Sequence, residues 1–122
     1  MNWESAKSLL LKNISTGMHL TPEYTYKIVT EVPPYQCKNY DNDVGFRVQV
    51  GAKSFINIPM SMLELLYVSS RQNHSIYNKA VFKSKYPQQV EVKPCHVHSV
   101  GKVFEFAGIM EQVSSREYRI KS

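Results

Sequence analysis

The feature that most constrains the fold of this chain is a change in hydrophobic period at Pro59. Before this proline, apolar residues alternate with polar ones, which is the pattern of a half-buried strand. After it, apolar residues recur every three or four positions, which is the pattern of a helix with one buried face. We therefore expect a helix and a sheet in the first half and helices in the second, an α+β fold.

Four stretches before Pro59 are predicted to be strands, at 24–32, 35–40, 46–50 and 55–58. Turn chemistry separates them: a double proline, an Asp-Asn-Asp cluster and a Gly-Ala-Lys turn. Short strands joined in this way predict an antiparallel meander. A helix over 2–14 precedes them, because Trp3, Ala6 and Leu10 have helical spacing, Asn2 is a suitable N-cap and Gly17 follows as a terminator.

The tetrapeptide Ser-Met-Leu-Glu at 61–64 matches a capping box, in which the serine and the glutamate satisfy each other's backbone donors. The helix that it opens is predicted to run to about Arg71 and to bury Leu63, Leu66 and Tyr67. Ser75 is expected to cap a short second helix over 76–85, which ends before Pro87.

A third helix is predicted over 94–107, with Gly108 at its end. Its inner stripe is Val97, Val100, Phe104 and Ala107. Weak alternation over 109–120, around a Ser-Ser turn, then predicts a terminal β-hairpin. Without a visible linker or repeat, the chain is expected to form a single domain, 1–122, with the sheet in 1–60 and the helical part in 61–122.

Positive charge is concentrated in the second half of the chain. The net charge is +5, and residues 61–122 contain nine lysines and arginines against five acidic residues. A basic half fits a polyanionic partner, since phosphate contacts supply affinity that does not depend on sequence. Nucleic acid is therefore an expected partner.

Several classes of protein are disfavoured by composition. The N-terminus lacks the basic and long apolar regions of a secretory signal, and Glu64 interrupts the longest apolar run. The two cysteines are too few for a disulfide framework. We expect a cytoplasmic protein that does not enter a membrane. No glycine-rich phosphate loop or nucleotide fingerprint occurs, so no cofactor is expected.

The stretch Cys95-His96-Val97-His98 raises the question of a metal or thiol centre. On a strand the two histidines would chelate together, but on a helix, at about 100° per residue, side chains two positions apart diverge by about 200°. Cys95 and His98 share a helix face, which leaves a two-ligand site open. Cys95 at a helix N-terminus beside His96 is also a candidate nucleophile, although no third orienting group is identifiable.

A metal-dependent nuclease is a further alternative. Glu91-Val92-Lys93 has the Glu-x-Lys spacing of restriction-type nucleases, and the only aspartates, Asp41 and Asp43, lie in a turn-like stretch. The acidic partner expected on a preceding strand is missing. We therefore expect a protein that is not an enzyme.

The order of helix 76–85, connection, helix 94–107 and hairpin 109–120 resembles a winged helix-turn-helix unit. This resemblance covers about the last third of the chain and implies that the second helix enters the major groove while the hairpin contacts the backbone or minor groove. The connection over 86–93 is longer than the family's tight turn. More loosely, the whole order is similar to small accessory modules of restriction and mobile-element systems.

The face of helix 94–107 opposite its inner stripe supplies the candidate DNA contacts. It carries His98, Ser99 and Lys102, which can donate to phosphates or base edges. Arg116 and Arg119 in the hairpin and Lys79 and Lys83 on the preceding helix are the remaining candidates, all for contacts with the phosphate backbone.

The leading hypothesis is thus a module that binds duplex DNA without catalysis. Phe106 is unusual on this polar face and marks a candidate protein interface. The alternative is therefore a module for protein interaction or self-assembly, with a homo-oligomer or another protein as its partner.

Overall fold

The structure is a computed structural model that describes residues 2–20, 27–28, 35–36 and 44–121. In chain order the elements are α1 (Trp3–Asn13), β1 (Lys27–Ile28), β2 (Tyr35–Gln36), β3 (Val44–Gly51), β4 (Ser54–Pro59), α2 (Met60–Gln72), β5 (Ile76–Tyr77), α3 (Lys79–Lys85), α4 (Pro87–Val92), α5 (Cys95–Phe106), β6 (Met110–Ser114) and β7 (Glu117–Ile120).

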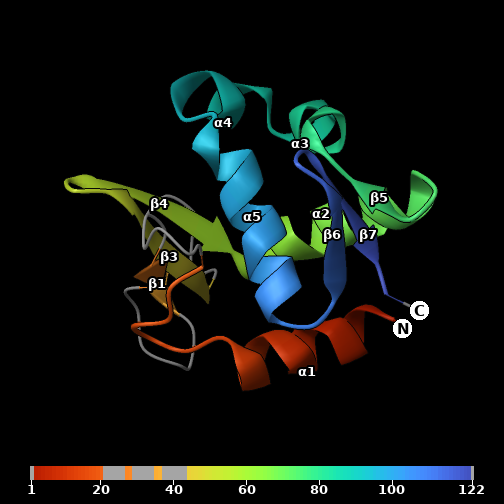
Figure 1. Cartoon of the computed structure of the whole chain (residues 1–122), viewed down its shortest axis with the longest axis horizontal. Helices are drawn as coiled ribbons and strands as arrows, with labels where there is room; N and C mark the ends of the chain where they lie inside the picture. Colours follow the sequence, from red (N-terminus) through yellow and green to blue (C-terminus); the bar gives the residue numbers. More distant parts are fainter. Residues whose placement is uncertain (1, 21–26, 29–34, 37–43, 122) are drawn as a thin grey trace.

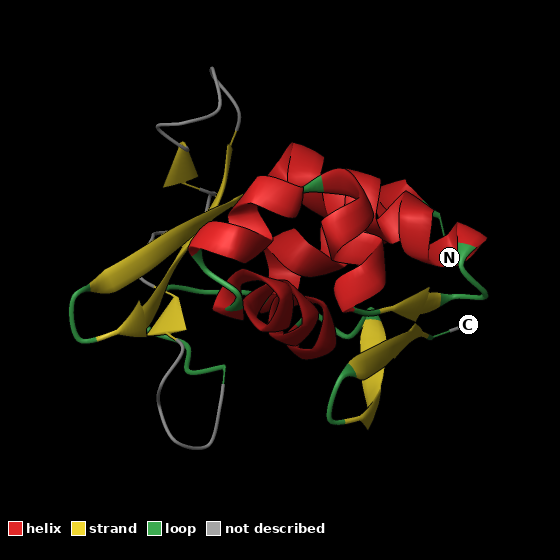
Figure 2. Ribbon diagram, turned by 90° about the horizontal axis from the view of Figure 1, so that it is seen from above, coloured by secondary structure: helices red, strands yellow, loops and turns green. Residues whose placement is uncertain are grey.

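The elements form two small antiparallel sheets with helices between them (Figure 1). One sheet contains β1 to β4 and the other has the order β5-β7-β6. Figure 2, seen from above, places the helices in the middle and the strands at the two sides. Residues from both halves of the chain contribute to one core cluster, including Leu10, Phe46, Leu66 and Phe104. The mixture of helices and antiparallel sheets confirms the predicted α+β class.

Helix α1 forms as its sequence predicts. The Asn2 side chain accepts a hydrogen bond from the Ser5 backbone at 2.9 Å, which satisfies one of the free N–H groups of the first turn. Ala6 and Leu10 are fully buried. Asn13 Nδ2 donates to the Ala107 carbonyl oxygen at 2.7 Å and so joins the end of α1 to the end of α5.

The first sheet is organised around β3, which pairs with β4 along its length. The buried side chains of these two strands include Phe46, Val48, Ile56 and Ile58. The expected meander is wrong in one respect: β1 pairs with β3 and not with β2, and β2 also pairs with β3. Eight residues of β3 are long enough to receive both two-residue strands on one edge. The remainder of the predicted strands 24–32 and 35–40 lies outside the described residues.

Helix α2 buries Leu63, Leu66 and Tyr67 as predicted, but the predicted capping box is wrong. The helix begins at Met60, with Pro59 as N-cap and without a side-chain cap hydrogen bond. The reason is that Pro59 still pairs with β3, so that the chain turns from strand to helix without an intervening residue.

The segment after α2 differs most from the prediction. Ser75 does not cap a helix, because Ile76 and Tyr77 form strand β5 and pair with β7. The N-cap lies three residues after Ser75, at Asn78, whose side chain accepts from the Val81 backbone at 3.0 Å. The connection 86–93 is not a loop, since it contains α4. A strand partner about forty residues away overrides the local helix signal, as the pairing of Ile76 with Arg119 illustrates.

Helix α5 and the hairpin of β6 and β7 confirm the predicted helix 94–107 and hairpin 109–120. Gly108 has a φ of +86° directly after the helix, a conformation that favours glycine. Val100, Phe104 and Ala107 are fully buried, as predicted, and Val97 is partly buried. Tyr77 of β5 donates from its hydroxyl to the Val97 carbonyl oxygen at 2.6 Å.

Gly101 provides a test of how closely the hairpin packs on α5. A Cβ atom at this position would collide with the Tyr118 ring. Glycine to alanine normally stabilises a helix interior by about 1 kcal/mol, but here we expect Gly101→Ala to lower the free energy of unfolding by about 1–3 kcal/mol. Urea denaturation measures this change. Gly51→Ala, where a Cβ meets only ordinary van der Waals contact, is the matched control and should be close to neutral. Stabilisation by Gly101→Ala would contradict the packing described.

Candidate nucleic-acid interface

The outer face predicted for α5 is largely covered in the structure. Ser99 was expected to meet nucleic acid, but it is fully buried, and its hydroxyl donates to the Cys95 carbonyl oxygen at 2.9 Å. The reason is that Ser99 lies one helical turn from His96 and from Val103, both buried, so the buried face of α5 is wider than the predicted stripe. The assignment of Ser99 as a DNA contact is therefore wrong.

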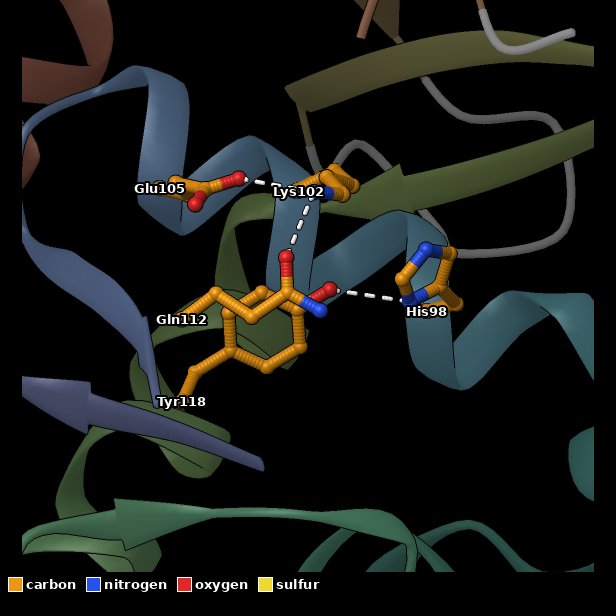
Figure 3. Close-up of polar contacts among 5 residues, drawn as sticks. All are labelled: His98, Lys102, Glu105, Gln112 and Tyr118. Atoms are coloured by element: carbon orange, nitrogen blue, oxygen red, sulfur yellow. Dashed lines mark hydrogen bonds and ion pairs between the residues drawn. The ribbon is translucent and has the colours of Figure 1, made fainter. Parts of the chain in front are cut away.

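His98 and Lys102 are held by the hairpin instead of facing solvent (Figure 3). His98 Nδ1 lies 2.8 Å from the Tyr118 hydroxyl, in a hydrogen bond. Lys102 Nζ donates to Glu105 Oε1 and to Gln112 Oε1, both at 2.9 Å, and only 13% of its side chain is exposed. A phosphate contact by Lys102 would require breaking these bonds, so we no longer place it in the interface.

The pKa of His98 is lowered from its usual value, first by burial and then by the charge of Lys102, while Glu105 acts in the opposite direction. A neutral imidazole cannot act as a cationic phosphate contact at neutral pH. The cluster in Figure 3 therefore ties the hairpin to α5, and it removes His98 from the candidate DNA contacts.

The two histidines of the Cys95–His98 stretch have different neighbours. The His96 ring lies 5.3 Å from the Phe82 ring, whereas His98 meets Tyr118. Cys95 is a free, partly buried thiol. Among the described residues, no group of three or more His, Cys, Asp or Glu side chains is placed to hold a metal ion.

His96 is buried, with 6% of its surface exposed. Burial, with a smaller contribution from the charge of Lys93, lowers its pKa from 6.5 to about 4, and a backbone hydrogen bond with Asn57 partly opposes the shift. The cause is desolvation, because removing the charged imidazolium from water is costly.

This shift predicts a specific loss of stability in acid. Between about pH 6.5 and pH 4 the unfolded chain binds a proton at His96 that the folded protein does not, so the free energy of unfolding falls as the pH is lowered. The full effect of a shift of this size is about 3 kcal/mol. Urea denaturation across this range should show a steeper pH dependence for the wild type than for His96→Gln, which keeps every other ionisable group. Parallel curves for the two proteins would contradict a buried neutral His96.

The basic residues of α3 and of the hairpin turn are exposed, and the start of α3 lies beside the residue that follows the turn. Asn78, directly before Lys79, donates from Nδ2 to Glu117 Oε2 at 3.1 Å, and Glu117 directly follows Arg116. Figure 1 shows the turn of the hairpin next to α3. We define the α3–hairpin surface as Lys79, Lys83, Lys85 and Arg116. Lys85, the last residue of α3, is exposed as well.

Arg119 is also exposed but points to a carboxylate. Its Nη2 donates to Glu111 Oε1 at 2.6 Å across the two strands of the hairpin. Exposed pairs of this kind are weak, so Arg119 can still exchange this partner for a phosphate. We place it at the margin of the α3–hairpin surface.

The Glu-x-Lys motif of the nuclease alternative spans the end of a helix. Glu91 lies on helix α4, and Lys93 follows the end of that helix. Lys93 Nζ donates to Ser54 Oγ and to the Phe55 carbonyl oxygen. Asp41 and Asp43 lie outside the described residues.

Comparison with protein-family models, with curated proteins and with solved structures found no match. In the described part of the chain, no helix combines the length and the apolar character needed to span a bilayer. The case for a function therefore depends on the geometry of the surfaces described above.

Proposed function

We propose that this protein binds duplex nucleic acid, most simply DNA, without catalysis, through the α3–hairpin surface. The observation that carries the proposal is the hydrogen bond between Asn78 and Glu117, which brings the start of α3 to the turn of the hairpin. Two separate basic segments thereby form one surface, and lysine and arginine side chains on such a surface are suited to contacts with the phosphate backbone.

The resemblance to a winged helix-turn-helix unit supports this proposal in part. The hairpin follows α5 and is joined by β5, which links it to α2 and α3. A hairpin held in this way is suited to contact a backbone, as the wing of that family does. Two features depart from the resemblance: α4 lies between α3 and α5, and α5 is covered. We accordingly propose phosphate contacts by α3 and the hairpin, with no reading of bases by α5.

The test is a salt titration of binding to a labelled duplex. Lys79→Gln/Lys83→Gln should weaken binding and reduce the slope of log affinity against log salt by about 0.9 for each lost phosphate contact. The matched control is Lys7→Gln/Lys12→Gln on α1, which removes the same charge at the other end of the molecule in Figure 1. Binding that is absent at low salt, or lost equally in both double variants, would refute the proposal.

Glu117 allows a test with the opposite sign. Glu117→Gln removes a negative charge beside Arg116 but retains an acceptor for the Asn78 amide. If a polyanion approaches this surface, the variant should bind it several-fold more tightly at low salt, because a like charge is removed. Weaker or unchanged binding would show that nucleic acid does not approach the hairpin turn.

Self-association is a second candidate function, and the exposure of Phe106 favours it. Phe106 is 42% exposed at the end of α5, as the sequence suggested. If the protein self-associates, light scattering should show a wild-type mass that rises with protein concentration. The mass of Phe106→Ser should stay at the monomer value. Val92→Ser on α4 is the control, because Val92 is 77% exposed and lies on another element. A wild-type protein that stays monomeric at high concentration would remove this alternative.

A further inference from the structure

Strand β4 has an outer edge at which its backbone faces the helical part of the chain. Among the described residues, β4 pairs with β3 alone. Pro59 lies opposite Gly45 in this pairing and has no N–H to give to the ladder. Hydrogen-bonded and non-hydrogen-bonded positions alternate along an antiparallel pair, so Phe55 and Asn57 are in the same kind of position as Pro59. Their N–H and C=O groups therefore point away from β3, toward the outer edge.

Two side chains from the helical part of the chain bond to this edge. Lys93 Nζ donates to the Phe55 carbonyl oxygen at 3.0 Å and to Ser54 Oγ at 2.8 Å. His96 has a backbone hydrogen bond with Asn57 that acts to raise the His96 pKa, so the ring donates and the Asn57 carbonyl oxygen accepts. Side chains in these places hinder pairing of the edge with another chain. Each carbonyl oxygen still has a second lone pair that can accept a hydrogen bond.

A hollow of about 540 Å³ lies beside this edge, which is a volume typical of ligand sites. Phe55 and Asn57 line it from β4, and Gln88, Val92 and Lys93 line it from α4 and the end of that helix. Val92 is 77% exposed, which is unusual for a valine on a helix. No described residue that lines the hollow is acidic. The hollow thus offers an exposed apolar side chain, an amide and a cation next to a strand edge.

We propose that this hollow binds an extended acidic peptide segment of a partner protein, which adds to β4 as a further strand. The backbone of the peptide pairs with the outward N–H and C=O groups of Phe55 and Asn57. An acidic side chain of the peptide bonds to Lys93, whose present acceptors are two neutral oxygens. Lys93, which closes the edge in the free protein, then holds the bound segment.

Charge complementarity favours a partner protein over a second copy of this chain. Two copies that paired through β4 would bring together two strands without an acidic residue, Ser54–Pro59 in each, so neither copy would supply a carboxylate to Lys93. A peptide with an aspartate or a glutamate supplies it. This site goes beyond the proposed function, because none of the residues that line the hollow belongs to the α3–hairpin surface.

The experiment starts from a displayed library of short random peptides, selected on the wild-type protein and counterselected on Lys93→Gln. We expect enrichment of peptides that combine β-branched residues with an acidic residue. An enriched peptide is then synthesised and titrated by fluorescence anisotropy. Its affinity should fall about tenfold in Lys93→Gln, which keeps a donor for Phe55 but loses the charge. Lys53→Gln, in the exposed turn between β3 and β4, is the matched control and should change the affinity less than about twofold.

N-methylation of the peptide tests the backbone pairing without changing the protein. Alternate amides of an added strand face β4, so methylation of one alternate set should abolish binding, whereas methylation of the other set should leave it nearly unchanged. Hydrogen exchange of the protein gives the complementary measurement. The amides of Phe55 and Asn57 should exchange more slowly in the complex, and those of Ile56 and Ile58, which belong to the ladder with β3, should not change.

The outcomes separate the peptide site from the proposed nucleic-acid surface. A library without enriched peptides, an affinity that is equal in the wild type and Lys93→Gln, or equal effects of the two methylation sets would overturn the peptide site. Displacement of the peptide by a DNA duplex would also overturn it, in favour of nucleic acid in the hollow. The Lys79→Gln/Lys83→Gln protein should keep its affinity for the peptide, and the Lys93→Gln protein should keep the salt slope of duplex binding.

Discussion

The contact between Tyr118 and Gly101 is the interaction on which the arrangement of the C-terminal half depends. The absence of a side chain at Gly101 lets the Tyr118 ring lie against the backbone of α5. From that position the Tyr118 hydroxyl reaches His98, and Gln112 on the neighbouring strand reaches Lys102. A packed aromatic ring and a small set of hydrogen bonds thus hold the short hairpin against α5. An isolated two-stranded hairpin is only marginally stable in water, so this packing stabilises it.

This packing decides which basic groups remain available to a partner. Lys102 is enclosed and bonded to Glu105, whereas Lys79 on α3 and Arg116 in the turn of the hairpin stay exposed. Helix α5 supports the hairpin, and the exposed basic residues of α3 and of the hairpin turn form the α3–hairpin surface. A basic half of the chain therefore does not imply that its most amphipathic helix is the element that contacts a polyanion.

The same helix also separates two environments. The α3–hairpin surface lies on the side of α5 that meets β6 and β7 (Figure 1), whereas His96, at the start of α5, lines a hollow together with residues of β3, β4 and α4. His96 and His98, two residues apart, belong to these two different environments. The divergence of neighbouring side chains on a helix, which argued against a shared metal ion, is what gives one short stretch two roles.

The sequence by itself determined the elements whose signals are local. Asn2 marks a helix start through its capping side chain, and Gly108 marks a helix end because a residue without a Cβ atom adopts a positive φ easily. The spacing of Val100, Phe104 and Ala107 identifies the buried stripe of α5. Only the tertiary structure decided the features that depend on distant partners. Ile76 joins a strand because Arg119 lies opposite it, and Ser99 is buried because the packed face of α5 is wider than its apolar stripe. Arg47 lies near His96 only after the sheet has packed against the helices. Local propensity contributes little to the stability of the fold, whereas burial and pairing between distant segments contribute more. Burial and pairing of this kind cannot be inferred from the spacing of neighbouring residues.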